Sequence, residues 1–580
     1  MKKILTGYWG RYKINLILTP IFVLLETIVS LALPSLMSGI VDSGVAGADR
    51  GLILRYGLFM VALSVLSAIA GVISTWNATC SSNGFGANLR EALFRHIQEF
   101  SFADIDRFSA ASLITRTTTD VRTLQSTIQM MLRTFIQCPF QLIVSLVIVF
   151  SYSPKLALIY VIAVPVLFAT VILLIRAVDA LFEIVEQKLD ALNADIQENL
   201  IAIRVVKAFV REHHERIKFR KANDELTHAN LKAVSLIVTM GPLANIFFNA
   251  ITLLLYWFGG RMVAKGELPS GQLLAIISYM TQILSSVMMF SMCLMQYSRS
   301  RVCGKRIAEV LDARPDIVSP EDAPAHPIGV HGGRVEFENV SFRYTGGTGE
   351  DVLHNISFSV APGETVAIVG GTGSGKSSLV NLIPRFYDVK DGRILVDGVD
   401  VRDYRLSDLR DGIGMVLQKN VLFSGTVREN MLWGNENAGT EEITEALTDA
   451  QAWDFVSAMP RGLDTYLTQG GANVSGGQKQ RLCIARAMLK KPAILILDDS
   501  TSAVDSDTES KIRESFDKNL KDTTVFIIAQ RISSVINADK IIVLDEGTVE
   551  SVGTHEELMR SSAIYREIYS SQVGEVLSNG

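Results

Sequence analysis

The first half of the chain alternates long apolar runs with charged segments. Six runs are predominantly apolar over about 20 residues or more, the length at which a helix crosses the hydrocarbon core of a bilayer. They lie near 14–40, 52–76, 127–150, 156–177, 236–258 and 271–297. One such run could be a buried helix of a soluble protein, but six in one half of a chain favour membrane helices. We therefore predict an all-α transmembrane bundle of six helices.

Two long charged segments separate these runs. Residues 80–126 and 178–235 are rich in Arg and Lys, whereas the connections near 42–51 and 151–155 are short and carry few basic residues. Because basic loops stay on the cytoplasmic side of a membrane, we predict that both long segments and both termini are cytoplasmic. Apolar residues recur among the charges at three- and four-residue spacing, which predicts that the membrane helices extend well into the cytoplasm.

The pattern changes after residue 311. Residues 312–330 are Pro-rich and lack periodicity, as is typical of a linker. Beyond them, VEFENVSFRY alternates as a strand does, and ETVAIVG, AILILDD, TVFIIAQ and KIIVLDEG predict further strands separated by helical stretches. This order predicts an α/β domain with a largely parallel sheet. The predicted organisation is a transmembrane domain at 1–311, a linker at 312–330 and an α/β domain at 331–580.

Composition fits a chain with one half in lipid and one half in water. Of its 580 residues, 48% are hydrophobic and 20% are charged, too apolar for an ordinary soluble enzyme and too charged for a membrane bundle alone. The net charge of −5 does not indicate a nucleic-acid partner. The five cysteines form no CxxC pair, so we expect free thiols rather than a zinc site or disulfides. These are Cys80, Cys138, Cys293, Cys303 and Cys483.

A glycine-rich turn after the strand ETVAIVG carries the first candidate chemistry. The stretch GGTGSGKSS fits the pattern G-x-x-x-x-G-K-S between a strand and a helix. Its glycines let backbone N–H groups surround phosphate oxygens, and the helix that follows adds the partial positive charge of its N-terminus. We expect Lys376 to reach the terminal phosphates and the Ser377 hydroxyl to bind Mg²⁺. The candidate phosphate-binding residues are Gly370, Gly371, Thr372, Gly373, Ser374, Gly375, Lys376, Ser377 and Ser378.

Two adjacent aspartates follow a second apolar strand. AILILDD ends in Asp498 and Asp499, roughly 120 residues after the glycine-rich turn. A P-loop ATPase needs a carboxylate at the end of such a strand to hold the Mg²⁺ shell, and Asp498 stands in that place. ATP and Mg²⁺ are therefore the expected cofactors.

The stretch NVSGGQKQRLCIARAMLKKPAILILDD, Asn473 to Asp499, resembles the signature sequence and Walker B strand of ATP-binding cassette (ABC) transporters. The order of six spans, linker and cassette resembles a half-transporter of the exporter type. The resemblance implies that Tyr344 stacks on adenine and that Gln418 contacts Mg²⁺ and the attacking water. It also implies a signature loop that caps the nucleotide of the opposite subunit, and a following loop, SAVD, that crosses to the partner. These residues are Ser475, Gly476, Gly477 and Gln478 for the signature and Ser502 to Asp505 for the crossing loop.

The resemblance also implies a dimer, because two ATP sites form only between two cassettes. Each site pairs the phosphate loop of one chain with the signature of the other. Residues 102–121 and 203–209 lie where the family has the elements that couple the cassettes to the membrane domain. A solvated charged face is the alternative for the individual residues of these two segments.

Two positions depart from the pattern of an active cassette. The family carries Glu, which polarises the attacking water, where this chain has Asp499, and His where it has Gln530. An aspartate carboxylate sits about 1 Å further back, and a displacement of that order costs about 10²-fold in rate. The amide of Gln530 can hydrogen-bond phosphate but takes neither proton nor charge. We therefore predict a degenerate site that binds Mg-ATP and hydrolyses it slowly, with an active site that tolerates both changes as the alternative.

These departures favour a heterodimer over a homodimer. The expected partner is a second half-transporter with Glu and His at the positions of Asp499 and Gln530, so that the chain resembles the degenerate-site subunit of a bacterial heterodimeric multidrug exporter. Its substrate would be an amphipathic small molecule. A lipid or peptide exporter is one alternative, and a regulatory membrane subunit that uses ATP only as a ligand is another.

Two features of the spans bear on the substrate. The last span is rich in methionine, which suits adaptable binding but also ordinary packing or contact with lipid. Glu26 is an acid within the first span, where it could meet a cationic substrate or a partner helix, or lie near the membrane interface. The methionines are Met280, Met288, Met289, Met292 and Met295.

Overall fold

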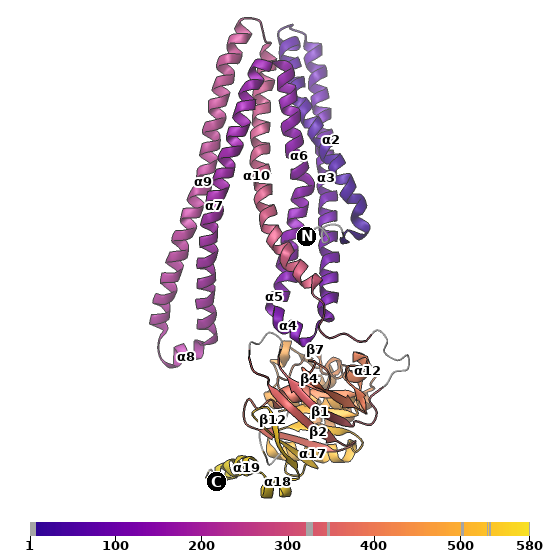
Figure 1. Cartoon of the computed structure of the whole chain (residues 1–580). Coiled ribbons are helices and arrows are strands. Elements are labelled where there is room, and N and C mark those ends of the chain that lie inside the picture. Colours follow the sequence, from indigo (N-terminus) through magenta and orange to yellow (C-terminus); the bar gives the residue numbers. More distant parts are fainter. Residues whose placement is uncertain are drawn as a thin grey trace. The chain divides into compact units, whose positions relative to one another are not determined.

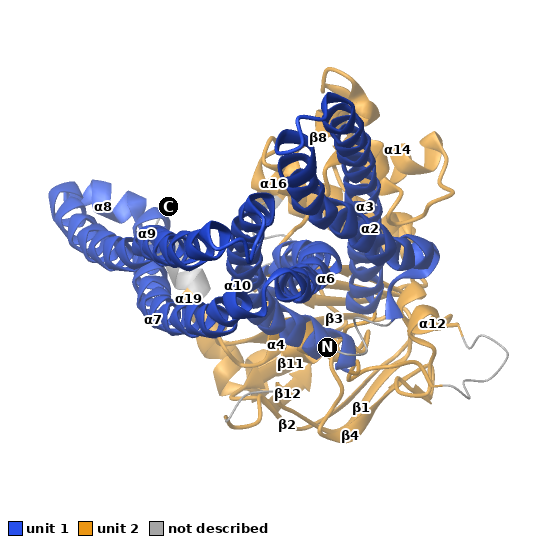
Figure 2. Cartoon of the chain, turned by 90° about the horizontal axis from the view of Figure 1, so that it is seen from above, with its two compact units in different colours: residues 1–98, 111–313 blue, residues 99–110, 314–580 orange. Residues whose placement is uncertain are grey.

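The structure, a computed structural model, describes residues 7–320, 329–344, 349–499, 504–529, 532 and 535–578. It divides into two compact units, coloured separately in Figure 2. The helical unit comprises residues 1–98 and 111–313, and the α/β unit comprises 99–110 and 314–580. A short piece of the first half of the chain therefore belongs to the α/β unit.

The helical unit consists of long helices that follow the predicted apolar runs. Within the described residues, six helices of 36 to 53 residues are long and apolar enough to cross a membrane. This confirms the predicted all-α bundle, and each helix is much longer than the roughly 20 residues that a bilayer requires. The main helices are α2 (Lys13–Gly39), α3 (Arg50–Gln98), α6 (Val121–Tyr152), α7 (Pro154–Ile201), α9 (Glu212–Ala264) and α10 (Ser270–Asp312). Shorter elements are η1 (Gly10–Tyr12), η2 (Ile40–Val45), α5 (Ala110–Thr115), η3 (Arg116–Asp120) and α8 (Ile203–Ala208).

The long helices pack in pairs, α2 with α3, α6 with α10, and α7 with α9 (Figure 1). Two buried tyrosines join neighbouring helices through hydroxyl groups. Tyr160 of α7 donates to the Ile276 carbonyl oxygen at 2.7 Å, and Tyr279 of α10 donates to that of Leu31 at 2.6 Å. A polar group in lipid needs a partner within the protein, and these bonds supply one for each hydroxyl.

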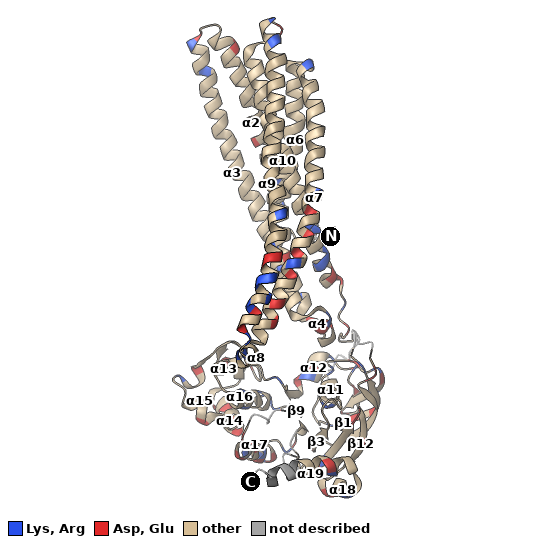
Figure 3. Ribbon diagram, turned by 90° about the vertical axis from the view of Figure 1, so that its left-hand side faces the viewer, with Lys and Arg blue, Asp and Glu red and all other residues tan. Residues whose placement is uncertain are grey.

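The ends of α7 and α9 that α8 connects carry most of the charge on this pair of helices (Figure 3). Lys188 of α7 pairs with Glu225 of α9 at 2.7 Å, and Lys218 of α9 pairs with Glu198 of α7 at 2.7 Å. The apolar and charged parts of each helix are continuous. The helices thus extend beyond their apolar spans, as the periodicity of residues 178–235 predicted.

The α/β unit is built on a six-stranded sheet in the order β12–β11–β3–β10–β9–β6. All neighbours pair in parallel except β12, which pairs antiparallel with β11. This confirms the predicted α/β domain with a largely parallel sheet. The strands are β3 (Thr365–Gly370), β6 (Ile413–Val416), β9 (Ile494–Asp498), β10 (Thr524–Ile528), β11 (Lys540–Asp545) and β12 (Thr548–Gly553).

A second, antiparallel sheet in the order β2–β1–β4–β5 packs its apolar face on the same core. Its strands are β1 (Val335–Phe342), β2 (Leu353–Val360), β4 (Asp391–Val396) and β5 (Val399–Asp400); β7 (Gly425–Thr426) pairs separately with β8 (Tyr466–Leu467). The helices are α11 (Lys376–Leu382), α12 (Leu406–Asp411), α13 (Val427–Met431), α14 (Thr440–Asp449), α15 (Trp453–Ser457), α16 (Gly476–Leu489), α17 (Ser506–Asn519), α18 (His555–Ser561) and α19 (Ala563–Ser578), with 3-10 turns η4 (Gly462–Asp464) and η5 (Gln469–Gly471).

Helix α4 (Phe102–Phe108) also belongs to the α/β unit. Its first turn is fixed by a capping box, in which Ser101 and Asp104 exchange side-chain to backbone hydrogen bonds. Asp104 is buried and also accepts a hydrogen bond from the Asp316 backbone N–H at 3.3 Å. The cap thus ties α4 to the segment that leads into the sheet.

Candidate nucleotide site

The glycine-rich turn forms a phosphate-binding loop between β3 and α11. Gly375 precedes α11 with φ of +92°, and a Cβ at Gly370 would lie 2.2 Å from the Leu544 carbonyl oxygen, so both positions require glycine. The Lys376 ammonium donates to the carbonyl oxygens of Gly370 at 3.0 Å and Gly371 at 2.6 Å. A ring of backbone amides, a helix N-terminus and an ammonium group together make an anion site for phosphate.

Burial lowers the pKa of Lys376, while the carboxylates of Asp498 and Asp499 act to raise it. The lysine is thus close enough to both aspartates of the AILILDD segment to interact with their charges. The ammonium group can pair with phosphate oxygens, and the carboxylates can face a metal ion bound beside the phosphates.

Asp498 is the last residue of β9 and is 4% exposed. Its Oδ1 accepts a hydrogen bond from the Ser377 hydroxyl at 3.0 Å, and burial raises the pKa of the carboxyl group. Within the described residues no group of three His, Cys, Asp or Glu side chains could hold a metal. One carboxylate and one hydroxyl fit Mg²⁺, which takes few protein ligands and completes its shell with phosphates and water.

Gln418 lies at the same edge of the sheet as Asp498. It is exposed and follows the end of β6 by two residues, and Val416 in β6 lies opposite Leu497 in β9. Since β6 and β9 are adjacent and parallel, the residues after both strands share one edge, at which ligands of α/β proteins commonly bind. The register therefore puts Gln418 beside the carboxylate strand.

Asp499 has its backbone held on both sides. Its N–H donates to the Ile528 carbonyl oxygen at 3.1 Å, and its own carbonyl oxygen accepts from Gln480 Nε2 at 3.2 Å. Its φ is +49°, in the left-handed region that aspartate and asparagine tolerate better than most residues. The backbone position from which the Asp499 side chain extends is thus fixed.

Tyr344 follows β1 and is 36% exposed. Its hydroxyl shares a 2.8 Å hydrogen bond with Ser378 in α11, so the ring is attached to the helix that begins at the phosphate loop. Phe342 and Tyr387 contact the ring edge to face, with centroids at 4.8 and 5.0 Å. A supported and partly exposed ring can stack on a flat base.

The signature residues form the start of α16. Ser475 caps the helix in a capping box with Gln478, and Gly476 and Gly477 make up the first helical positions. Ser475 and Gly476 are exposed, and α16 lies with α13, α14 and α15, apart from α11 (Figure 3). The structure therefore does not bring this loop to the phosphate loop of the same chain.

Asp505 caps α17, where its carboxylate accepts from the Thr508 backbone N–H at 3.0 Å. That hydrogen bond, with a second one from the Thr508 hydroxyl, lowers the pKa of Asp505. Gln530 and residues 500–503 lie outside the described residues. The strand before Gln530, β10, lies between β3 and β9, with Ile528 opposite Asp498.

Two residues of the site were missed by the sequence analysis. Gln480 is buried in α16 and fixes Asp499, but it stands between Lys479 and Arg481 in the sequence, so no local pattern indicates that it is buried. Tyr387 supports Tyr344 and bonds to α4, and no pattern around it indicates this role.

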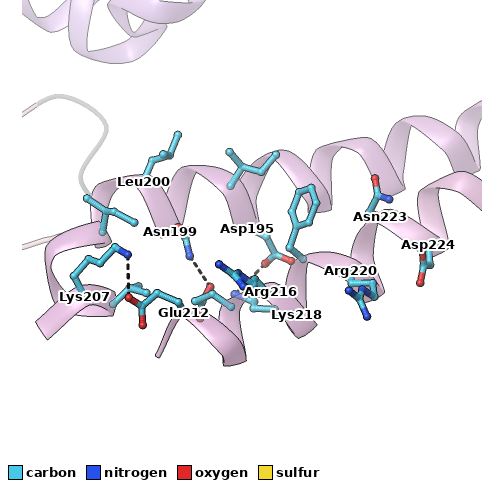
Figure 4. A pocket seen from close by; sticks show the side chains of 15 residues that line it. Asp195, Asn199, Leu200, Lys207, Glu212, Arg216, Lys218, Arg220, Asn223 and Asp224 are labelled. Carbon is cyan, nitrogen blue, oxygen red and sulfur yellow. Dashed lines mark hydrogen bonds and ion pairs between the residues drawn. The ribbon is translucent and has the colours of Figure 1, made fainter. Parts of the chain in front are cut away.

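The segments expected to couple the units have different surroundings. Residues 102–121 form α4, α5 and η3, and α4 packs Phe102 on Phe386, with ring centroids 4.6 Å apart. Residues 203–209 contain α8, beside a pocket between the ends of α7 and α9 (Figure 4). Among the residues that line it, Lys218 pairs with Asp195 at 3.1 Å and Lys207 pairs with Glu212 at 2.9 Å.

Glu26 has a partner within the helical unit. Its Oε2 lies 3.3 Å from Arg133 Nη2 of α6 and accepts from the Ser74 hydroxyl of α3 at 3.2 Å. Arg133 also donates to Thr75 at 2.6 Å. The acid of the first span therefore joins three helices of its own chain. Of the methionines in the last span, Met280 is buried, whereas Met289 and Met292 are 49% and 58% exposed.

The five cysteines are free, in agreement with their spacing. Four are buried, and burial raises the pKa of the Cys483 thiol in α16. The four buried thiols have the surroundings of small apolar residues.

Comparison with known proteins shows which family the chain belongs to. Residues 16–287 match the model of the ABC transporter transmembrane region, and residues 353–502 match the ABC transporter model. An uncharacterised ABC transporter ATP-binding protein of Bacillus subtilis, YfiB, is 40% identical over 96% of both chains. The chain therefore belongs to the ABC transporter family. It has the form of an exporter half-transporter, with a six-span membrane domain fused to one ABC cassette.

More distant relatives are named for particular cargo. A putative multidrug export ATP-binding/permease protein of B. subtilis, YgaD, is 32% identical over 97% of both chains. An ATP-dependent lipid A-core flippase of Haemophilus influenzae is 31% identical over 97% of this chain and 95% of its own. The solved structure of a bacterial Atm1-family ABC exporter with ATP bound matches with a TM-score of 0.83 at 26% identity, covering 97% of this chain and 99% of its own.

Membership of this family implies a multi-pass membrane protein whose cassette binds ATP and whose ATP hydrolysis is coupled to transport. Half-transporters of this kind generally work as dimers.

Proposed function

We propose that the chain is one half of a heterodimeric exporter of amphipathic small molecules, and that its own ATP site binds Mg-ATP but hydrolyses it slowly. The name of YgaD supports the substrate class, and the exposed Met289 and Met292 supply adaptable apolar surface on the last span. We place the protein in the cell membrane with both termini cytoplasmic, which the basic segments 80–126 and 178–235 support. The proposed domains are those predicted from the sequence, 1–311 and 331–580 with the linker between them.

The residues for binding Mg-ATP are complete. The phosphate loop and Lys376 receive the phosphates, and Tyr344 offers its ring to the adenine. Ser377, Gln418 and Asp498 would hold Mg²⁺, and the 3.0 Å bond between Ser377 and Asp498 supports this. When bound, Mg²⁺ would supply positive charge that neutralises the charge of the phosphates.

Asp499 and Gln530 should activate water less well than the Glu and His of an active cassette. The observation that carries this proposal is the fixed backbone of Asp499. Hydrogen bonds to Ile528 and Gln480 hold its N–H and carbonyl groups, so the main chain cannot advance to compensate for the missing methylene. A carboxylate about 1 Å short of its water costs about 10²-fold in rate. Gln530, which follows β10 by two residues in the sequence, lacks the charge and proton affinity of histidine.

A partner with Glu and His at these two positions would form the competent site. This chain would supply the signature to that site, since Ser475 and Gly476 are exposed at the N-terminus of α16. Asp505, which caps α17 after the crossing loop, would border the same interface. Most ATP would then be hydrolysed at the site that contains the partner's phosphate loop.

The test is ATP hydrolysis by the purified chain, alone and with the half-transporter it assembles with. We expect little hydrolysis by the chain alone and at least tenfold more in the heterodimer. In inverted vesicles, transport of an amphipathic dye should stop when the partner's catalytic Glu is replaced by Gln and persist with Asp499→Asn. Brisk hydrolysis by this chain alone, abolished by Lys376→Ala, would overturn the proposal.

A lipid cargo is the second candidate, favoured by the flippase among the relatives. Fluorescent lipid that changes leaflet in proteoliposomes of the heterodimer, with no dye transport, would select it. Nucleotide binding without transport of either cargo would instead identify a regulatory subunit.

A further inference from the structure

Tyr387 lies between the nucleotide site and helix α4. It follows α11 in the sequence and is half-buried. Its hydroxyl donates to Asp106 Oδ2 of α4 at 3.0 Å, and its ring lies 6.2 Å from that of Phe102. All these residues belong to the α/β unit, although 281 positions separate Asp106 from Tyr387 in the sequence. Figure 1 shows α4 beside the strands of this unit.

The Tyr387 ring also contacts Tyr344. Their centroids are 5.0 Å apart and their planes meet at 88°, the edge-to-face geometry that stabilises aromatic pairs. Tyr344 is bonded in turn to Ser378 in α11. A continuous set of contacts therefore runs from Asp106 through Tyr387 and Tyr344 to the helix of the phosphate loop.

Each contact in this set restricts the orientation of a ring. The perpendicular contact with Tyr387 limits the tilt of the Tyr344 ring, and the hydrogen bond to Asp106 limits the tilt of Tyr387. Burial and the Asp106 carboxylate raise the pKa of Tyr387, so its hydroxyl stays protonated and remains a donor. Phe386, the residue before it, packs on Phe102 and keeps α4 in contact with this surface.

We propose that Tyr387 is a positioning residue that sets the orientation of the adenine-facing Tyr344 ring according to the contact of α4 with the cassette. Base binding and α4 contact then stabilise each other, because coupling between two binding events is reciprocal. The proposal rests on the proposed role of Tyr344 in holding adenine. It predicts that a residue of α4, remote from the phosphates, affects affinity for the base.

The experiment compares ATP with inorganic tripolyphosphate, which has the phosphates but no base. Affinities of the full chain for both, with Mg²⁺, are measured by titration calorimetry in nanodiscs. Tyr387→Phe and Asp106→Ala should each weaken ATP binding about threefold, and Tyr387→Ala about tenfold, because the edge-to-face pair is lost. Tripolyphosphate binding should stay within about twofold.

Further variants separate positioning from general stability. The double variant Tyr387→Phe with Asp106→Ala should be no weaker than either single variant, because both remove the same bond. Asp106→Asn keeps an acceptor and should restore ATP affinity. Tyr404→Phe is the matched control, because Tyr404 is a buried tyrosine of the same unit whose hydroxyl donates to the Val396 carbonyl oxygen at 2.9 Å. It should leave the preference for ATP over tripolyphosphate unchanged.

Equal weakening of ATP and tripolyphosphate by the Tyr387 variants, or unchanged ATP binding by Asp106→Ala, overturns the proposal. These results differ from failure of the proposed function, in which the unaltered chain itself would not bind ATP.

Discussion

At the residue scale, the nucleotide site differs from that of an active cassette by one methylene at Asp499 and one ring at Gln530. Asp498 is buried and bonded to Ser377, and it has a metal ligand's surroundings. Asp499 is one residue further along a backbone that is held at both its N–H and its carbonyl. Geometry rather than acidity separates it from glutamate, since the ordinary pKa values of Asp and Glu differ by only about 0.4.

Lengthening the acid should therefore restore turnover. Asp499→Glu with Gln530→His is expected to raise ATP hydrolysis by the chain about 10- to 100-fold, because the carboxylate reaches the water and imidazole replaces the amide. Either change alone should give less. Steady-state release of phosphate measures the effect, and unchanged hydrolysis by a double variant that still binds ATP would contradict the geometric explanation.

The buried Asp498 should make stability depend on pH. Because burial raises its pKa, the folded protein keeps a proton there at pH values at which the unfolded chain, with a pKa of about 3.9, has lost it. Stability therefore falls as pH rises through the raised pKa, and the loss is complete above it. Without nucleotide, Asp498→Asn should raise the Tm by a few degrees at pH 7.5 and change it little near pH 4.

The same variant should lose the extra thermal stability that Mg-ATP gives the unaltered chain. Asp545→Asn, at the end of the parallel strand β11, is the control and should preserve that stabilisation. A lower Tm for nucleotide-free Asp498→Asn at pH 7.5 would show that ionised Asp498 stabilises the fold, against this expectation.

At the element scale, the ion pair of Glu26 and Arg133 fastens α2 to α6, with Ser74 and Thr75 of α3 bonded to its two members. The two side chains are only 27% and 20% exposed, and removing one member leaves a largely uncompensated charge, which costs up to about 3 kcal/mol. Glu26→Ala should thus lower the unfolding temperature in detergent markedly, and Glu26→Gln with Arg133→Met should recover much of it.

The exposed pair of Lys155 and Glu267 supplies the control, with 77% and 43% exposed side chains. Such a pair contributes about 1 kcal/mol or less, so Glu267→Ala should change the unfolding temperature little. An equal effect of Glu26→Ala and Glu267→Ala would mean that the Glu26 pair does not hold the helices together.

The elements themselves were largely predictable, and the contacts between them were not. Apolar runs predicted the six long helices, and strands bounded by turns predicted the parallel sheet, because both signals are local in sequence. The partner of Glu26 is 107 residues away and that of Asp106 is 281 residues away. Periodicity carries no information about such pairs. The sequence therefore allowed several roles for Glu26 and gave no reason to select Tyr387.

At the scale of the whole molecule, the parts of one chain do not complete an ATP site. The signature at the start of α16 bonds within its own capping box, and in the described residues it lies apart from α11. The resemblance to ABC transporters predicted this separation, since in that family each ATP site pairs the phosphate loop of one chain with the signature of the other. The exposed signature supports our proposal that this chain completes the ATP site of a partner.

The most direct measurement is the identity of the nucleotide bound by this chain. The purified chain is incubated with labelled ATP and Mg²⁺, freed of unbound nucleotide, and denatured, and the released label is separated into ATP and ADP. We predict mainly ATP from the unaltered chain, mainly ADP after Asp499→Glu with Gln530→His, and no label after Lys376→Ala. Mainly ADP from the unaltered chain, formed as fast as by the double variant, would contradict this prediction.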